Sequence, residues 1–456
     1  MLGRLLYRNF LLVYRVSQWT RDRFTPAGAL ILGGAVGAGI FGIDTRQTLA
    51  FQVFSITASL LLLAMLSVFT FRGNFRIRRK LPDFGTVGEP VNYKILVENT
   101  GRQRQRELLL IDVLESHLPA YSEFKTTMDP DDRKRNWYDR KIGYPRLMGI
   151  IQKKRGGSIS PVAMDDLPPD QEVEFNACLF PVRRGYIHFT RSRVARPDPL
   201  GIYRAIKSKI NTDSLLILPK RYRVPVINLT GTRKYQKGGL SMAGSVGDSR
   251  EFISLRDYRP GDPLRDIHWR SYAKLGHPVV KEFHDEFYVR QGLLLDTFIE
   301  DNSESIFEEA VSVAASLTVS LNTQDALLDL MFIGAEAYRF TAGRGLGKTE
   351  NMLEILACVT PCRDRSFSSL ETMLSGYLTD TSGLICVLQN WDNKRRNLIR
   401  FIRSRKIPVL VFQIAEDGKP GLDVSPADID PDCFITLKAG QIQDQLDHIK
   451  IPDEIK

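Results

Sequence analysis

The sequence predicts a three-part architecture: a membrane α-hairpin, an all-β sandwich, and an α/β domain with a doubly wound, mainly parallel sheet. Three observations predict it. Two long uncharged apolar runs lie between residues 27 and 71, alternating strand-like runs follow to about residue 194, and from residue 291 apolar strand-like runs alternate with helical segments. The 456 residues suffice for two soluble domains of ordinary size beyond the hairpin.

These changes of pattern also divide the chain. We expect a basic amphipathic interfacial segment over 1–24, a two-helix transmembrane hairpin over 25–72, a β-sandwich over 73–225 with a basic insertion at about 121–165, a linker with a signature motif over 226–290, an α/β domain over 291–450 and a tail over 451–456.

The hairpin is predicted from residues 27–43 and 48–71, which contain no charged side chain. Each run approaches or exceeds the roughly 17–25 residues that a spanning helix needs. The four residues between them leave room only for a tight turn. A buried soluble hairpin and a cleaved signal peptide are the alternatives, but the long segment before the first run and the second span directly after it favour a permanent anchor.

Positive charge predicts the orientation of this hairpin. Five arginines precede it and five basic residues follow it closely, whereas the turn holds only Arg46. By the positive-inside rule, both termini and the soluble domains face the cytoplasm. Small residues at four-residue spacing, such as Gly33 with Gly37 and Ala35 with Gly39, predict close approach of a second helix, either the second span or another protomer.

The first sixteen residues place leucines and Phe10 among Arg4, Arg8 and Arg15. This pattern predicts an interfacial basic helix on the anionic lipid of a bilayer. The formal net charge of +10 fits such a protein and requires no nucleic acid.

The β-domain is predicted from alternating runs at 91–97, 106–113, 172–180 and 186–194, which favour an immunoglobulin-like sandwich. Residues 133–155 carry nine Lys or Arg with Trp137, Tyr138 and Tyr144 among them. This insertion is interpreted either as a module that binds anionic lipid or nucleic acid, or as a solvated loop that covers a sheet edge.

Residues 251–283 form the most distinctive segment. Asp262 suits an N-cap, Pro263 suits the first helical position and Gly276 suits the residue after a helix, so a helix over 263–275 is predicted. The segment strongly resembles the signature of the bacterial family called domain of unknown function 58. The matching residues are Arg256, Tyr258, Gly261, Asp262, Arg265, Ile267 and Trp269, with Ala273 and Lys281.

The resemblance carries several expectations. It implies a membrane hairpin, a β-rich domain, the signature and then a von Willebrand factor A-like domain, in a multi-pass protein of the bacterial plasma (inner) membrane. It implies no established chemistry. Because the family is placed beside MoxR-type AAA+ ATPases and transglutaminase-like proteins, a MoxR-type AAA+ ATPase is the suspected partner, with other membrane proteins as alternatives.

Two interpretations of the signature remain open. In the first it is structural: Trp269 and Tyr258 are core, and the arginines pair with Asp257 or Asp266. In the second it is a docking surface centred on Arg265, Trp269 and Lys281, because Arg and Trp are enriched among residues that dominate interface energies.

A metal site is a further hypothesis for the α/β domain. The resemblance implies an Asp-x-Ser-x-Ser motif after the first strand, but Phe298 and Glu300 stand where the hydroxyls after Asp296 belong. Five residues on, the motif is matched by Asp301, Ser303 and Ser305, with Asp392 as a distal carboxylate, and oxygen ligands of this kind suit Mg²⁺. The alternative for Ser305 is a capping box with Glu308. No other cofactor is predicted.

Residues 342–349, AGRGLGKT, fit a relaxed phosphate-loop pattern with Lys348. The strand-like run before them is short and polar, and Asn390 stands where a Mg²⁺-binding carboxylate would be expected after the apolar run 384–388. The sequence shows no catalytic constellation. We therefore expect an adaptor or interaction protein that works with a MoxR-type AAA+ ATPase in assembly or maturation of other proteins. The alternatives are an NTPase or metal-dependent enzyme and an anionic lipid or nucleic-acid binding module.

Overall fold

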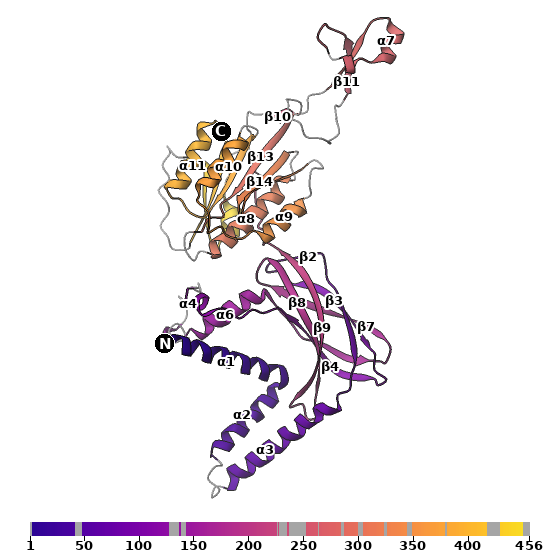
Figure 1. The fold of residues 1–456 in the computed structure, drawn as a ribbon, viewed down its shortest axis with the longest axis vertical. Coiled ribbons are helices and arrows are strands. Elements are labelled where there is room, and N and C mark those ends of the chain that lie inside the picture. The colour runs from indigo at the N-terminus through magenta and orange to yellow at the C-terminus, as the bar shows by residue number, and fades with distance from the viewer. Residues whose placement is uncertain are drawn as a thin grey trace. The chain divides into compact units, whose positions relative to one another are not determined.

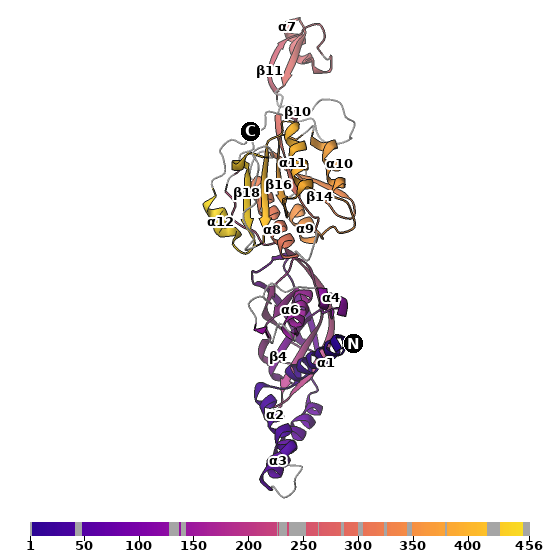
Figure 2. The same cartoon turned by 90° about the vertical axis from the view of Figure 1, so that its left-hand side faces the viewer.

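The computed structural model describes residues 2–41, 48–126, 136–137, 143–225, 227, 235–236, 252–262, 264–283, 287–299, 304–322, 326–343, 349–378, 381–416 and 429–449. The chain divides into two compact units (Figures 1 and 2). The first is Met1–Lys220 with Leu356–Cys358, and the second is Arg221–Ile355 with Val359–Lys456. Each unit is described by itself.

Three helices open the first unit. They are α1 (Leu2–Arg23), α2 (Pro26–Phe41) and α3 (Thr48–Leu66), and the 3₁₀ turn η1 (Ser67–Thr70) follows. Residues Leu49–Thr70 form a 22-residue helical segment with a mean hydropathy of 2.2, long and apolar enough to cross a membrane, whereas Pro26–Phe41 is apolar but shorter. One such segment weakly indicates membrane association. Figures 1 and 2 show α2 and α3 extending away from the strands of the same unit.

The helices α2 and α3 lie against each other. A Cβ atom on Gly39 would meet the ring of Phe54 at 3.2 Å, and Ala35 is buried. Cβ atoms on Gly33, Gly34 and Gly37 would meet nothing within 4 Å. Of the small-residue pairs predicted from spacing, Ala35 with Gly39 therefore faces the second helix.

Two β-sheets complete the first unit. One sheet has the order β1-β3-β7-β5 and the other has the order β2-β9-β8-β4-β6, with only the β2–β9 pair parallel. The two sheets share one apolar core, to which β3, β4, β8 and β9 all contribute. The bounds are β1 (Phe75–Lys80), β2 (Phe84–Thr86), β3 (Val91–Asn99), β4 (Gln105–Leu114), β5 (Gly157–Ile159), β6 (Val162–Leu167), β7 (Glu172–Pro181), β8 (Gly185–Pro197) and β9 (Arg204–Leu218).

The basic insertion differs from its prediction as a loop. It holds the helices α4 (Tyr121–Thr126) and α6 (Tyr144–Arg155), and the strands β5 and β6 already lie within or overlap the predicted range 121–165. Helix α6 forms because Pro145 stands in its first turn, Leu147, Ile150 and Ile151 are buried at helical spacing, and Gly156 closes it with a left-handed φ of 82°. The basic residues are thus borne partly by a packed helix.

A buried ionic cluster joins the two sheets. The Arg79 side chain, on β1, is fully buried and makes two hydrogen bonds to the Asp112 carboxylate of β4, at 2.9 and 3.0 Å. The same guanidinium donates to Asp213 of β9 at 2.8 Å, and the Tyr93 hydroxyl donates to Asp112 at 2.8 Å. The pKa of Tyr93 is raised, first by burial and then by the Asp112 charge.

The second unit contains a sheet of order β15-β14-β13-β16-β17-β18, with β10 (Tyr235–Gln236) paired antiparallel to β13. Strand β15 is antiparallel to β14, and β14, β13, β16, β17 and β18 run parallel. The strands are β13 (Phe287–Leu295), β14 (Ala326–Ile333), β15 (Ala337–Ala342), β16 (Gly383–Leu388), β17 (Val409–Ala415) and β18 (Phe434–Lys438). The helices are α8 (Glu304–Asn322), α9 (Thr349–Cys358), α10 (Ser368–Tyr377), α11 (Asn393–Ser404), α12 (Ile442–His448) and the short η5 (Pro431–Cys433).

The signature forms a small structure of its own, with β11 (Phe252–Asp257), η3 (Leu264–Asp266), α7 (Trp269–Leu275) and β12 (Val279–Phe283). We call residues 252–283 the signature module. The single helix predicted over 263–275 is wrong. Ile267 forms a β-bridge with Val280, which interrupts the helical path between η3 and α7. Gly276 does end α7, with a left-handed φ of 72°.

The elbow between α1 and α2, residues 24–25, is fixed to the β8–β9 turn. Phe24 and Tyr203 form an antiparallel bridge, and the Thr25 N–H donates to the Ile202 carbonyl at 3.1 Å. The Thr25 hydroxyl donates to the Gly201 carbonyl at 2.5 Å. Backbone pairing of this kind couples the first three helices to the sandwich.

The turn that receives the elbow is itself held by one carboxylate. Asp198 accepts hydrogen bonds from the N–H groups of Ile202 at 2.6 Å and Tyr203 at 2.7 Å. Beside it, Arg193 pairs with Asp22 of α1 at 2.6 Å. Because Arg193 lies on β8, this ion pair is a second link between α1 and the sandwich.

We expect Gly28→Ala to destabilise the first unit. The new Cβ would lie 1.9 Å from the Ile202 carbonyl oxygen, so the elbow or the turn must shift, and overpacking of this kind costs about 1–3 kcal/mol. Gly33→Ala is the control, because its Cβ would meet nothing within 4 Å. Thermal unfolding of the full-length protein in micelles measures both. Equal midpoints for the two variants would contradict the docking described above.

Candidate functional site

The signature module is built around a two-stranded antiparallel ribbon. Arg256 lies opposite Val280 and Asp257 lies opposite Val279 in the register of β11 with β12. The module buries only a few apolar side chains, among which Ile267, Val279 and Val280 are each less than a tenth exposed. So small a core leaves most side chains of the module at its surface.

Arg256 and Asp262 form the internal lock of this module. The guanidinium makes two hydrogen bonds to the carboxylate, at 2.7 and 2.8 Å, and the Arg259 N–H donates to the same carboxylate at 2.8 Å. These bonds, with that to Arg256 the largest, lower the pKa of Asp262 to about 2. Gly261 makes the turn possible with a φ of 107°. The predicted N-cap role of Asp262 is therefore wrong, because its carboxylate closes the turn before η3.

Helix α7 exposes large apolar side chains. Trp269 is 62% exposed, Tyr272 41% and Leu275 57%, and Leu264 of η3 is 67% exposed. We call these four residues the exposed apolar group. The Trp269 and Tyr272 rings meet edge to face with their centres 6.0 Å apart. Positions 269, 272 and 275 share one arc of the helix, so an isolated module offers a continuous apolar strip there.

Cations accompany this strip. The Arg265 side chain is 72% exposed, with its nearest carboxylate, that of Asp266, 4.0 Å away. Arg270 and Lys274 are exposed on the adjacent arc of α7. A surface with exposed aromatic rings and exposed guanidinium groups can bind an apolar groove that carries carboxylates at its edge.

The structure places the signature residues in three settings. Arg256 and Asp262 hold the fold of the module. Tyr258 is half-buried and its N–H donates to the Pro278 carbonyl, and Lys281 is half-buried on β12. Arg265 and Trp269 are exposed, so the interpretation of Trp269 as core is wrong. Of the predicted pairings of the arginines with Asp257 or Asp266, that of Arg265 with Asp266 is present at 4.0 Å, whereas Arg256 pairs with Asp262, which was not predicted as a partner.

A second cluster lies at the carboxyl ends of β13 and β16. In an open α/β sheet this is the point where ligands usually bind, because the strand order reverses there. Asp296, directly after β13, is fully buried, and Arg395 of α11 is 1% exposed. The Arg395 Nε atom lies 2.7 Å from an Asp296 carboxylate oxygen, and its Nη1 atom lies 2.9 Å from the Asp392 carboxylate.

Arg395 thus places a fixed cation among these carboxylates. Asp392 also accepts from the Arg395 N–H at 2.9 Å as the N-cap of α11, and Gln389 donates to the Asp296 carbonyl at 2.6 Å. Asp296 further accepts from the Phe298 N–H at 3.0 Å. Both carboxylates are engaged by an internal guanidinium, which gives them the positive charge that a bound ion would supply.

The residues predicted to bind a metal are only partly within the described chain. Asp301 and Ser303 lie outside it, Ser305 is exposed in the first turn of α8, and Asp392 is paired with Arg395. Within the described residues, no three His, Cys, Asp or Glu side chains are grouped so that they could hold a metal ion. The Mg²⁺ site stays a prediction.

The phosphate-loop prediction also falls largely outside the description, because residues 344–348, Lys348 among them, are not covered. Its flanks are described: β15 ends at Ala342 and α9 begins at Thr349. Strand β15 is the antiparallel edge strand of the sheet, away from the point of strand-order reversal where ligands of open α/β sheets bind. The NTPase hypothesis gains no support from this position.

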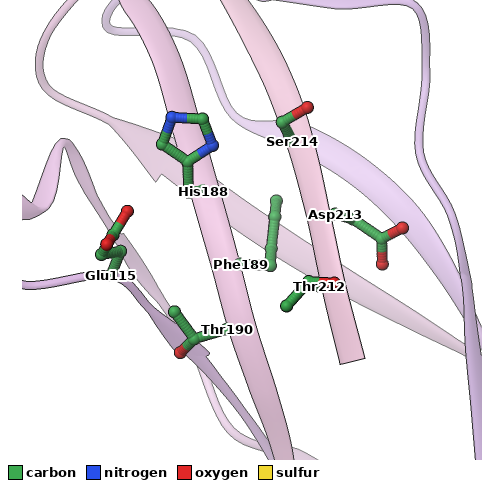
Figure 3. A pocket seen from close by; sticks show the side chains of 7 residues that line it. All are labelled: Glu115, His188, Phe189, Thr190, Thr212, Asp213 and Ser214. Carbon is green, nitrogen blue, oxygen red and sulfur yellow. The ribbon is translucent and has the colours of Figure 1, made fainter. Parts of the chain in front are cut away.

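An open hollow of about 380 Å³ lies on the five-stranded sheet of the first unit, where β4, β8 and β9 meet (Figure 3). Polar side chains line most of it, with His188 opposite Ser214 in the register and Glu115 next to the end of β4. Asp213 on its rim is the residue that also accepts from Arg79. Register shifts in β8 against both neighbours produce this hollow.

Sequence reasoning missed the Asp296–Arg395 pair, the exposure of Leu264 and Leu275, and the hollow. A signal for the first existed: Asp296 ends an apolar strand and Arg395 lies three residues after the N-cap Asp392. The exposure of Leu264 and Leu275 and the hollow depend on the tertiary fold, which spacing does not reveal.

Residues 254–382 match the family model described as "Protein of unknown function DUF58". The chain is also 30% identical over 180 residues to "Uncharacterized protein YeaD" of Bacillus subtilis (strain 168). That alignment covers 39% of this chain and 43% of the relative, so the chain spans less than half the length of the curated relative it matches. Both matches support the DUF58 family for this chain.

Two solved structures are remote likenesses of this chain. A Bacteroides fragilis protein described as a beta-galactosidase is 8% identical to this chain, with a TM-score of 0.15. The alignment covers 80% of this chain and 41% of that protein. A GH20 exo beta-N-acetylglucosaminidase from Vibrio harveyi is also 8% identical, with a TM-score of 0.14. That alignment covers 75% of this chain and 57% of the Vibrio protein. Scores this low carry no argument about fold or activity.

We expect Arg395→Met to destabilise the second unit by about 3–5 kcal/mol, because it leaves the Asp296 carboxylate buried without its counter-charge. Chemical denaturation of the full-length protein measures the change. Arg403→Met, an exposed position on the same helix, is the matched control. The double variant Arg395→Met with Asp296→Asn should recover part of the lost stability. Equal stability of Arg395→Met and Arg403→Met would contradict the proposed pairing.

The turn of the signature module should loosen in acid. The pKa of Asp262 is lowered, so the stability that its ionised form provides is present above the ordinary value of 3.8 and is lost as the pH falls through about 2. Amide hydrogen exchange of residues 256–262 in the full-length protein, corrected for intrinsic rates, reports this loss. Arg256→Gln should reduce the local pH dependence, because only the Arg259 N–H then still bonds the carboxylate, and an unchanged profile in that variant would show that another group is responsible.

Proposed function

We propose that this chain is a membrane-anchored, cytoplasm-facing adaptor that binds a protein partner through its signature module. The observation that carries the proposal is the exposed apolar group of α7 and η3, which places Trp269, Tyr272, Leu264 and Leu275 in solvent beside exposed cations. Soluble surfaces rarely leave such a strip open unless it contacts something.

The exposed side chains of the signature module indicate what kind of partner it binds. Trp, Tyr and Arg are the residues that most often dominate interface energies, and Trp269, Tyr272 and Arg265 are all exposed here. We infer a partner with an apolar groove for the two rings and carboxylates at the rim for Arg265, Arg270 and Lys274. Charge complementarity of this kind raises the rate and the specificity of association.

The resemblance to the DUF58 signature favours a MoxR-type AAA+ ATPase as this partner, acting with the chain in assembly or maturation of other proteins. The matched residues 254–382 include nearly all of the module and the first part of the α/β sheet. A second membrane protein is the alternative occupant, and capture from the native membrane distinguishes the two.

The finer description of each part belongs to the same proposal. We assign the sandwich to the immunoglobulin-like class and the second unit to the von Willebrand factor A-like class, in a multi-pass protein of the bacterial inner membrane. The order β15-β14-β13-β16-β17-β18 with an antiparallel β15 supports the second assignment. The Arg395 guanidinium at the point of strand reversal favours protein contacts that need no metal there.

Tagged full-length protein, crosslinked in its native membranes, tests the proposal by affinity capture and mass spectrometry. We expect an AAA+ ATPase to be recovered and Trp269→Ala to weaken its binding by at least about 2 kcal/mol, or ~30-fold in Kd. Trp137→Ala is the matched control, since Trp137 is 71% exposed elsewhere in the chain. Both variants must keep the unfolding midpoint of the parent.

The outcomes separate the hypotheses. Loss of capture in Trp269→Ala and in Arg265→Ala with Lys281→Ala, but not in Trp137→Ala, supports the docking surface. Equal capture by all variants refutes it. Nucleotide turnover that is abolished by Lys348→Ala would favour the NTPase alternative instead, and heat on adding Mg²⁺ that is abolished by Asp301→Ala would favour a metal-dependent enzyme.

A further inference from the structure

Helix α1 has an inner face that packs on the sandwich domain. Tyr7 and Tyr14 are each 7% exposed and form a cluster with Leu147 and Ile151 of α6. Phe10 and Leu11 pack against the same cluster, and the Arg155 guanidinium donates to the Tyr14 hydroxyl at 3.1 Å. The inner face therefore needs no further partner.

The opposite face of α1 is also apolar, yet it is exposed. Leu5 is 63% exposed, Leu12 61%, Val16 53% and Trp19 50%. Spacings of seven, four and three residues place them along one stripe, which lies on the side of the helix away from Tyr7 and Tyr14. A helix with two apolar faces has two partners, and only the first is supplied by the described chain around it.

Basic residues border this outer stripe. Arg4, Arg8 and Arg15 are exposed, and at 100° per residue they fall on the arc next to Leu5, Leu12 and Trp19. Trp at the border of an apolar stripe and arginines beside it are the composition of helices that lie in the interfacial zone of an anionic bilayer.

The position of the outer stripe within the first unit favours a bilayer over a protein as the partner of this stripe. Helix α2 begins three residues after the end of α1, and the elbow between them is fixed to the β8–β9 turn. Figures 1 and 2 show α6 on one side of α1 and the α2–α3 pair extending from the other. The outer stripe thus faces the side toward which the apolar helix of residues 49–70 extends.

We propose that α1 is a lipid-binding helix that lies in the plane of the membrane surface, with its outer stripe among the acyl chains just below the headgroups and its arginines on anionic phospholipid. The inference rests on the proposed membrane anchoring. It adds a second, surface-bound contact that holds α6, and through α6 the sandwich, against the bilayer. The ligand class is an anionic phospholipid surface.

Spin labels measure this arrangement in the full-length protein, reconstituted in nanodiscs of phosphatidylcholine with phosphatidylglycerol. Cys178 and Cys358, the two cysteines that are not buried, are first replaced by serine. Single cysteines are then placed by Leu12→Cys on the outer stripe, Leu62→Cys on α3 and Lys153→Cys on α6, all at exposed positions. Accessibility to oxygen and to a water-soluble nickel chelate gives the depth of each label.

We expect the Leu12→Cys label to be more accessible to oxygen than to nickel, the Leu62→Cys label to lie deeper still, and the Lys153→Cys label to be in water. A deep Leu62→Cys label with a Leu12→Cys label in water overturns this inference alone and leaves the anchor intact. Both labels in water overturn the anchor as well. A Leu12→Cys label that neither reagent reaches shows a protein contact on the stripe and overturns the inference.

The charge dependence is tested separately with Arg4→Gln, Arg8→Gln and Arg15→Gln combined. In the parent protein the Leu12→Cys label should move toward water when phosphatidylglycerol is omitted, and the triple variant should show that shallower depth in both lipid mixtures. The control Arg21→Gln, an exposed arginine at a different angle of α1, should behave like the parent. A depth that is the same in both lipids for every protein overturns the role of anionic lipid.

Discussion

The backbone pairing between the α1–α2 elbow and the β8–β9 turn is the constraint on which the first unit depends. Thr25 makes one main-chain and two side-chain hydrogen bonds to this turn, and Phe24 bridges to Tyr203. Because Asp198 fixes the turn from within, the helices are attached to a rigid part of the sandwich. The directions of α1 and α2 are set at the same point, which gives α1 one face on α6 and leaves its other face exposed.

Buried guanidinium groups organise the interior in both units. Arg79 joins the two sheets of the sandwich through Asp112 and Asp213, and Arg395 of α11 joins that helix to the end of β13 through Asp296. Arg suits such buried pairs because its planar guanidinium group can donate two hydrogen bonds to one carboxylate. Such pairs are weak contributors to net stability but are costly to break, so they favour one arrangement of strands over others.

Two groups of exposed arginines accompany exposed apolar side chains. They do so on α1, beside Leu5, Leu12 and Trp19, and on the signature module, beside Trp269 and Leu275. The first helix is continuous with an apolar hairpin, whereas the second lies on a small ribbon with its own internal lock, Arg256 with Asp262. That difference in setting is the basis for assigning a lipid surface to one and a protein groove to the other.

Sequence periodicity alone determined the parts of the chain whose structure is local. The apolar helices, the strands β3, β4, β7 and β8 and the alternation after residue 291 follow from spacing, since burial of one face imposes period two or 3.6 directly on the residues. Strand β9 was missed because the residues in its first half do not alternate between apolar and polar, and the helix over 263–275 was wrong because Ile267 pairs with a strand thirteen residues away. Only the tertiary structure decided which carboxylate meets Arg395, which carbonyl meets Thr25 and that Trp269 is exposed. Those contacts join residues up to 177 positions apart, and such pairings are set by strand register and turn geometry rather than by any pattern within a single segment.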